Sequence, residues 1–206
     1  MSPAELVRAQ LELECIGVDA ERTLYRIPGE NPDDIHRVFL VLHSEGTELF
    51  VRHDVDPSVA VQLRRTRAAI WWRDPTGIAR LLYGSDGLPV GAWRGSTYCF
   101  TTPYPTDAFP SVTATPDGRF VVWLEGIEVS WAWSARANTR CAELATETAE
   151  AFRRRGFAIQ VCRAWANTQL AQGRIPFYSH RSDNVPSAKL ARALGVSHFM
   201  DCVSFP

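Results

Sequence analysis

The stretch Ala142-Glu143-Leu144-Ala145-Thr146-Glu147-Thr148, followed by Phe152-Arg153-Arg154-Arg155-Gly156-Phe157-Ala158, decides how the rest of the chain is interpreted. One interpretation is a strand, a basic glycine loop and a helix that runs to Leu170. Arginines at a helix N-terminus oppose the helix dipole, so an anion bound among them would resolve a local conflict. The other interpretation is a short helix from Thr148 to Arg155 that Gly156 terminates. This window by itself fits both interpretations equally well.

The composition indicates a globular protein that does not bind polyanions. With 206 residues, of which 46% are hydrophobic and 22% charged, the chain can form one large domain or one and a half small ones. The formal net charge is −1, whereas general nucleic-acid binders carry a basic excess. The longest basic run is Arg153-Arg154-Arg155. We therefore expect no nucleic-acid partner.

Neither a membrane segment nor a disulfide framework is expected. No stretch approaches the roughly 20 apolar residues of a membrane span, and the N-terminus lacks a basic segment followed by an apolar one. The five cysteines are spread widely without a C-x-x-C pair, which indicates reduced core thiols and no metal site. These features predict a cytoplasmic protein with no membrane partner.

The N-terminal half reads as helices around a hairpin. Ser2-Pro3-Ala4-Glu5 is a capping box that predicts a helix to about Cys15, and a short strand is expected near Thr23–Ile27. Ile35–His43 and Glu48–Arg52 form the arms of a predicted hairpin, and Asp56-Pro57 begins a helix that is expected to continue through Ile70. Paired tryptophans such as those that follow this helix more often fill a core than bind a ligand.

The middle of the chain is rich in turn-forming residues. Residues 84–118 contain many Gly, Pro, Ser and Thr, which marks loops or an ordered crossing between two subdomains. From near its end onward, Val112–Ala114, Arg119–Leu124 and Ile127–Ser134 predict an antiparallel meander. In the last of these strands Trp131 and Trp133 alternate with small residues, as expected for a sheet with two different faces.

The C-terminal part predicts a strand, a crossover helix and a second, parallel strand. Gly173 ends the helix, Ile175–Ser179 is strand-like, and a helix over Val185–Leu194 follows with Asp183 or Asn184 as its cap. A last strand lies within Ser197–Phe205. The glycine loop would then lie at the carboxyl end of the first strand, where ligands bind in open α/β sheets.

These residues resemble the GNAT superfamily of acyl-CoA-dependent N-acetyltransferases. Arg153-x-x-Gly156-x-Ala158 is similar to its pyrophosphate loop, and Asn184-x-x-Ser187 after Ile175–Ser179 is similar to its later strand and helix. The resemblance covers roughly Arg119 to the C-terminus. With the second block present, Gly156 is favoured as the turn that opens a helix, and the short-helix interpretation is disfavoured.

The resemblance implies a mixed α/β (α+β) fold. The sheet would be mostly antiparallel, with a central parallel strand pair splayed around the cofactor and helices on both faces. Residues 1–95 would form an N-terminal helix and hairpin subdomain or a degenerate GNAT-like half, and residues 96–206 the acetyl-CoA-binding domain.

The resemblance also implies the cofactor and its contacts. Acetyl-CoA would be the co-substrate, and no metal is needed. Backbone groups near Thr146 and Thr148 would bind the pantetheine arm, and amides from Arg154 to Ala158, with the arginine side chains, would hold the pyrophosphate. The complete set of expected cofactor contacts is Thr146, Thr148, Arg153, Arg154, Arg155, Gly156, Phe157, Ala158, Ser179, Asn184 and Ser187.

Transfer to an amine also needs a base and an acid, because an alkylamine with a pKa of about 10.4 is mostly protonated at neutral pH. Glu143 is the leading candidate base, although a strand carboxylate paired with an arginine is an equally good interpretation. Tyr178 is a candidate acid, although a packed aromatic residue is more common. His180 could serve as base or acid, although a loop histidine is usually exposed.

Two functions follow from these features. The first is an N-acetyltransferase that acts on a primary amine of a small molecule or peptide, as a monomer or homodimer. The alternative is a non-catalytic acyl-CoA-binding GNAT domain that senses or scaffolds. A mixed-sign groove beside Trp131, Trp133 and Trp93 would favour the enzyme.

Overall fold

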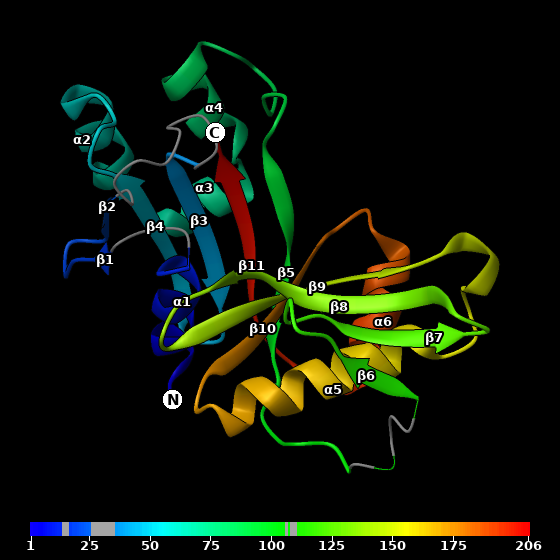
Figure 1. Ribbon diagram of the computed structural model, residues 1–206. Coiled ribbons are helices and arrows are strands. Elements are labelled where there is room, and N and C mark those ends of the chain that lie inside the picture. The colour runs from blue at the N-terminus through cyan, green and yellow to red at the C-terminus, as the bar shows by residue number, and fades with distance from the viewer. Residues whose placement is uncertain (14–16, 26–35, 106, 108–110) are drawn as a thin grey trace. The chain divides into compact units, whose positions relative to one another are not determined.

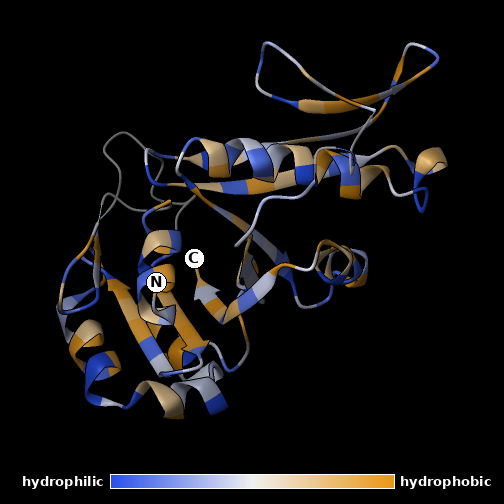
Figure 2. Ribbon diagram, turned by 90° about the horizontal axis from the view of Figure 1, so that it is seen from below, coloured by the Kyte–Doolittle hydropathy of each residue, from blue (hydrophilic) through white to orange (hydrophobic). Residues whose placement is uncertain are grey.

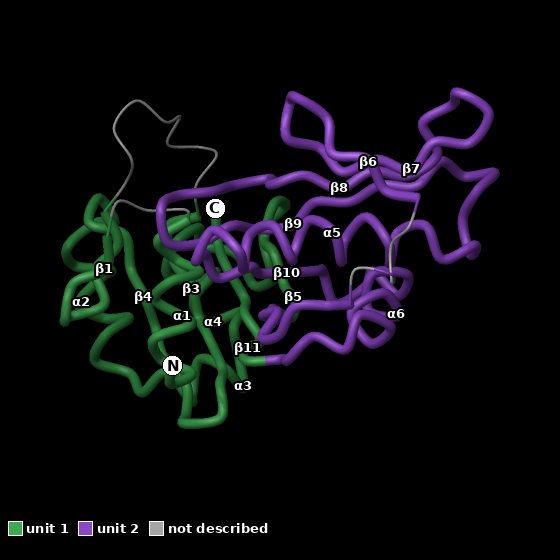
Figure 3. The backbone as a smooth tube through the Cα atoms, turned by 60° about the horizontal axis from the view of Figure 1, so that its bottom comes forward, with its two compact units in different colours: residues 1–96, 199–206 green, residues 97–198 purple. Residues whose placement is uncertain are grey.

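The computed structural model describes residues 1–13, 17–25, 36–105, 107 and 111–206. The chain divides into two compact units, residues 1–96 with 199–206 and residues 97–198, drawn in green and purple in Figure 3. Strand β5 (Trp93–Cys99) begins in the first unit and ends in the second. Each unit has its own hydrophobic core.

The sheet of the first unit is mainly antiparallel (Figure 1). Its strands follow the order β1-β2-β4-β3-β11, and only β2 and β4 pair in parallel. The bounds of these strands are Gly17–Val18 for β1, Thr23–Tyr25 for β2, Val38–His43 for β3, Gly46–Arg52 for β4 and Ser197–Phe205 for β11. The predicted hairpin and final strand are therefore confirmed.

Helices contact this sheet on both of its faces. Val38 and Leu40, alternate residues of β3, lie in an apolar cluster with residues of the three helices that follow β4. The N-terminal helix also contacts β3. The helices of the unit are α1 (Pro3–Leu11), α2 (Pro57–Arg65), α3 (Ala68–Arg73) and α4 (Thr76–Tyr83). Figure 2 shows hydrophilic and hydrophobic residues mixed along the helices, as expected for helices with one buried face.

Two predicted helices of this unit differ in length from the structure. The capping box at Ser2 is present, but α1 ends at Leu11, and residues 14–16 lie outside the described residues. The helix expected to run through Ile70 is broken, because Thr66 adopts an extended conformation between α2 and α3. Trp71 and Trp72 pack against the apolar cluster, as the core interpretation predicted.

The second unit contains the predicted meander and crossover. Its strand order is β10-β9-β8-β7-β6, and β9 and β10 pair in parallel while the other neighbours are antiparallel. The strand bounds are Val112–Ala114 for β6, Phe120–Leu124 for β7, Ile127–Ala137 for β8, Cys141–Thr148 for β9 and Ile175–Arg181 for β10. The expected mixed, mostly antiparallel α/β fold is thus confirmed.

One apolar core joins both helices of this unit to the sheet. Helix α5 (Phe157–Ala171) contacts β8 and β9, and α6 (Val185–Leu194) contacts α5 and β10. Trp165 of α5 is fully buried in this core and donates a hydrogen bond from Nε1 to Ser134 Oγ at 3.0 Å. These contacts fix the position of α5 against the sheet.

The structure settles the alternatives left open for two segments. Between Thr148 and Arg155 there is only a short 3₁₀ turn, η3 (Glu150–Phe152), so the interpretation of this segment as a helix ended by Gly156 is wrong. Residues 84–118 include β5, a strand that the turn-rich composition did not reveal. The domain division at residue 95 stays a prediction, since the compact units also place residues 199–206 with the N-terminal part.

The cysteines of the described residues, Cys99, Cys141, Cys162 and Cys202, are buried. Burial raises the pKa of the Cys162 thiol to about 12, so this thiol is neutral at physiological pH and unsuited to nucleophilic attack. Cys15 lies outside the described residues. No helix in the described part of the chain is long and apolar enough to cross a membrane.

Candidate functional site

The parallel strands β9 and β10 separate at Glu143. Their ladder joins Cys141 to Ile175 and ends where Glu143 pairs with Phe177, although β9 continues to Thr148 and β10 to Arg181. Along residues 144–148 the β10-facing edge of β9 has no partner strand among the described residues. Backbone donors and acceptors on that edge are available to an extended ligand.

The loop after β9 forms an anion-binding backbone conformation. Gly156 is the N-cap of α5 with φ +83°, and Arg154 also has a positive φ of +62°. No side chain of the described residues caps this helix, and its first turn contains no acidic residue. The free N–H groups of the first turn and the positive end of the helix dipole therefore meet at an uncapped site, which suits a phosphate group.

The three arginines of the loop are exposed around this helix end. Arg153 Nε donates to the backbone oxygen of Thr148 at 3.2 Å, which ties the loop back to β9. The guanidinium of Arg155 lies over the ring of Phe152, 5.2 Å from its centroid. Phe157 and Ala158 are the first residues of α5, so their amides belong to its uncapped turn.

Thr146 and Thr148 use their side chains within the sheet. Thr146 Oγ1 donates to the backbone oxygen of Trp131 at 3.0 Å, and the hydroxyls of Thr148 and Ser130 share a hydrogen bond of 2.7 Å. These bonds leave the predicted role of the two threonines to their backbone groups. Because only the backbone of Thr146 is expected to bind the pantetheine arm, its side chain does not prevent that contact.

Glu143 is a buried carboxylate at the point of separation. Only 7% of the residue is exposed, Ser179 Oγ donates to Oε1, and Arg136 Nη1 lies 3.4 Å from Oε2. The arginine pair expected from the sequence is therefore present. Since Ser179 bonds to this carboxylate, its hydroxyl positions Glu143 in addition to any contact with a cofactor.

Asn184 and Ser187 serve the local structure of α6. Asn184 Oδ1 accepts the backbone N–H of Ser187 at 3.1 Å, which confirms Asn184 as the helix cap. Asn184 is exposed, so its amide group can also face a ligand. Gly195 ends the helix with φ +69°, as predicted.

Tyr178 is a core residue. It is 4% exposed, and its hydroxyl donates to the backbone oxygen of Ser187 at 3.5 Å. Desolvation by burial raises the pKa of Tyr178 to about 12. Its proton is therefore held more firmly than that of an ordinary phenol, which makes Tyr178 a weak acid.

This shift predicts how stability changes with pH. A phenol whose pKa is raised in the folded state stabilises the fold below the unfolded-state pKa of about 10, and that contribution is lost as the pH rises towards 12. The free energy of unfolding of the wild type should therefore fall more than that of Tyr178→Phe between about pH 9 and about pH 11. The full shift corresponds to about 2.7 kcal/mol at most.

Urea unfolding of the wild type and of Tyr178→Phe at the two pH values measures this difference. Equal losses of unfolding free energy in the two proteins would contradict the burial argument. The same variant tests Tyr178 as the acid of a transfer reaction. Full turnover by Tyr178→Phe would remove it from that role.

His180 lies in a pair that sequence reasoning missed. It belongs to β10 and is 8% exposed, so the expectation of an exposed loop histidine is wrong. Its Nδ1 lies 3.0 Å from the backbone oxygen of Arg181, which only accepts, so Nδ1 carries a proton. Nε2 lies 3.3 Å from the hydroxyl of Tyr98, whose ring stacks on the imidazole. Tyr98 comes from β5, a strand absent from the sequence prediction.

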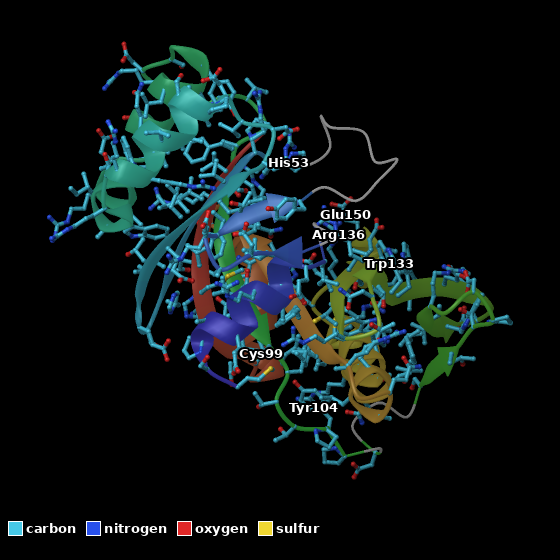
Figure 4. All side chains as sticks on the ribbon, turned by 90° about the vertical axis from the view of Figure 1, so that its left-hand side faces the viewer. His53, Cys99, Tyr104, Trp133, Arg136 and Glu150 are labelled. Carbon is cyan, nitrogen blue, oxygen red and sulfur yellow. The ribbon has the colours of Figure 1, made fainter. Side chains whose placement is uncertain are left out.

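An open cavity of about 660 Å³ lies on the face of β8 that carries the tryptophans. Its lining combines two aromatic side chains with charged groups of both signs: Asp117, Gly118, Arg119, Trp131, Trp133, Ser134 and Glu147. Figure 4 labels Trp133 and Arg136 of the same strand. The lining fits the mixed-sign aromatic groove expected from the sequence, except that Trp93 is not part of it.

Together, the separated strands and the uncapped helix define an α/β unit with a basic glycine loop after its central strand. The model of the GNAT acetyltransferase family matches residues 119–199, which contain this whole arrangement. This match confirms, for residues 119–199, the resemblance to GNAT acetyltransferases drawn from the sequence.

Solved structures with a similar fold include a GCN5-related N-acetyltransferase-like protein of Streptococcus suis, at 14% identity and a TM-score of 0.48, with 98% of each chain covered. Another is an acetyltransferase of the GNAT family from Colwellia psychrerythraea, at 13% identity and a TM-score of 0.46, with 98% of this chain and 96% of that chain covered. Among curated proteins, a search found no match.

Proposed function

We propose that the protein is an acetyl-CoA-dependent N-acetyltransferase that acts on a primary amine. The observation that carries this proposal is the uncapped N-terminus of α5, with left-handed Arg154 and Gly156 before it, beside the unpaired edge of β9. Pyrophosphate and an amide-containing arm need these two kinds of backbone group. A cytoplasmic location and a monomeric or homodimeric state belong to the same proposal.

The residues of the loop fit a bound pyrophosphate. Amides from Arg154 to Ala158 would hold its oxygens, and exposed guanidinium groups would neutralise its charge. Residues 144–148 of β9 would bind the pantetheine amides through the edge that faces β10. Acetyl-CoA would supply the thioester carbonyl that the amine attacks.

Glu143 would accept the proton of the amine, directly or through water. Its carboxylate lies at the point where the strands separate, and the donors Ser179 and Arg136 hold it in place. A water chain from the amine to Glu143 would let the carboxylate act without leaving its partners.

The departing thiolate needs a proton, and two groups are near the separated strands. Tyr178 was the acid expected from the sequence, but its raised pKa and its hydrogen bond to Ser187 make it a weak proton donor. In the Tyr98–His180 pair, Nδ1 of His180 bears a proton, and Nε2 lies 3.3 Å from the hydroxyl of Tyr98, which is a second proton donor. We favour this pair as the acid because it places two polar hydrogens on the part of β10 that has separated from β9.

Calorimetric titration with acetyl-CoA and with coenzyme A tests the proposal, followed by a transfer assay over a panel of primary amines. Binding together with thiol release that depends on an amine is the expected result. A protein that binds coenzyme A and transfers to no amine would instead be a non-catalytic acyl-CoA-binding domain. Absence of coenzyme A binding would overturn both functions.

A further inference from the structure

Paired residues of β8 and β9 lead from the tryptophan cavity along the sheet to Glu143. In the β8–β9 ladder Trp131 lies opposite Glu147, Trp133 opposite Ala145, and Arg136 opposite Glu143. Directly paired residues share a face of the sheet. Ala142 and Leu144 belong to the α5 core, so Glu143, Ala145 and Glu147 lie on the other face. We call this row of three residues, with Trp131 and Trp133 beside it, the acidic track.

The two ends of the acidic track differ in solvent exposure. Glu147 is exposed and lines the cavity, whereas Glu143 is buried and held by hydrogen bonds. At about 3.3 Å per residue, four residues of strand separate their Cα atoms by about 13 Å. Ala145 lies between them, opposite Trp133. Its small side chain leaves room for an alkyl chain along this face of β9.

The charges around the open end favour a cation. Arg119 is paired with Asp117 at 2.7 Å and with Glu128 at 2.9 Å, which leaves the group of Asp117, Glu128, Glu147 and Arg119 with excess negative charge. Hydrogen bonds from Thr115 and Arg119 lower the pKa of Asp117 to about 2, so it is charged at neutral pH. Tryptophan faces also attract ammonium groups.

We propose that the amine acceptor is an elongated molecule with a second cationic group, such as an alkyl diamine. The reacting amine would lie near Glu143, the alkyl chain along Trp133 and Ala145, and the second ammonium group between Trp131 and Glu147. The cavity of about 660 Å³ is ample for the part of such a chain that would lie beside Trp131, Trp133 and Glu147. This inference rests on the proposed function, because Glu143 marks the reacting end.

Alkyl diamines and monoamines of equal chain length separate the effect of the second charge from that of the chain. The affinities of diaminobutane to diaminododecane, and of the matching monoamines, are measured by calorimetry without acetyl-CoA, and their KM values in the transfer assay. We expect the best diamine to bind about fivefold more tightly than its monoamine, as an exposed ion pair allows. The preference should peak at an intermediate chain length.

Glu147→Gln should reduce this preference to about one, since the second ammonium group loses its partner. The matched control is Glu125→Gln, an exposed glutamate in the turn between β7 and β8, which should keep the preference. Trp133→Leu should weaken the binding of both amine series by removing the aromatic wall. Coenzyme A affinity is the measure that each variant retains its fold.

Equal affinity for diamines and monoamines in the wild type, or an unaltered preference in Glu147→Gln, would overturn the inference. Failure of the proposed function gives a different result, namely no binding of coenzyme A. Since diamine binding is measured without acetyl-CoA, the two failures are told apart in the same set of titrations.

Discussion

Replacement of Gly156 with aspartate is expected to weaken coenzyme A binding at least about a hundredfold, which corresponds to about 3 kcal/mol. A non-glycine residue in the left-handed conformation costs about 1–2 kcal/mol, and Gly156 has φ +83°. The new carboxylate would also repel a pyrophosphate at the end of α5. A Cβ at this position meets no atom within 4 Å, so the effect would not come from a steric clash.

Two further variants separate strain from charge in this result. Gly156→Ala keeps the strain without the carboxylate, so its loss of affinity should be smaller. Gly173→Asp places the same residue in a left-handed conformation, φ +72°, at the other end of α5. It should lower stability similarly and leave coenzyme A binding intact. Unchanged coenzyme A affinity in Gly156→Asp, measured by calorimetry, would refute the assignment of this loop.

Replacement of Glu143 with glutamine is expected to lower kcat about a hundredfold or more, the usual contribution of a general base. Glutamine has nearly the same shape and can still accept a hydrogen bond from Ser179, so coenzyme A binding should be retained. The measurement is steady-state turnover over a range of pH, with coenzyme A affinity as the readout of an intact site.

The matched control is Glu150→Gln, because Glu150 is an exposed glutamate of the same unit in the short turn after β9. It should keep full turnover. If Glu143→Gln also turns over at the wild-type rate at every pH, Glu143 is not the base. Loss of turnover in Ser179→Ala, with coenzyme A binding preserved, would support its role in positioning Glu143.

The Gly156 and Glu143 variants test different properties of the candidate site. The Gly156 variant tests a backbone conformation, which any side chain at that position disturbs. The Glu143 variant tests one functional group at a fixed place. Because cofactor binding and proton transfer fail separately, the pair distinguishes an enzyme from a domain that only binds acyl-CoA.

Local sequence signals determined much of the second unit. The strand-like run before Thr148, the glycine at 156 and the cap at Asn184 each act on the residues immediately around them, so β9, α5 and α6 were predicted close to their observed bounds. The helix expected through Ile70 was wrong because its apolar spacing continues across Thr66, where the backbone turns extended. Spacing alone does not show such a break.

The sequence by itself determined the glycine turn that opens α5, because such a turn is a local property of the chain and the block from Ile175 to Ser187 disfavoured the short-helix interpretation. Tertiary structure decided which side chains meet across strands. Glu143 meets Ser179 and Arg136, and His180 meets Tyr98, although each pair is separated along the chain. Strand register sets these contacts, and register depends on the pairing of distant segments, which no short stretch of sequence encodes.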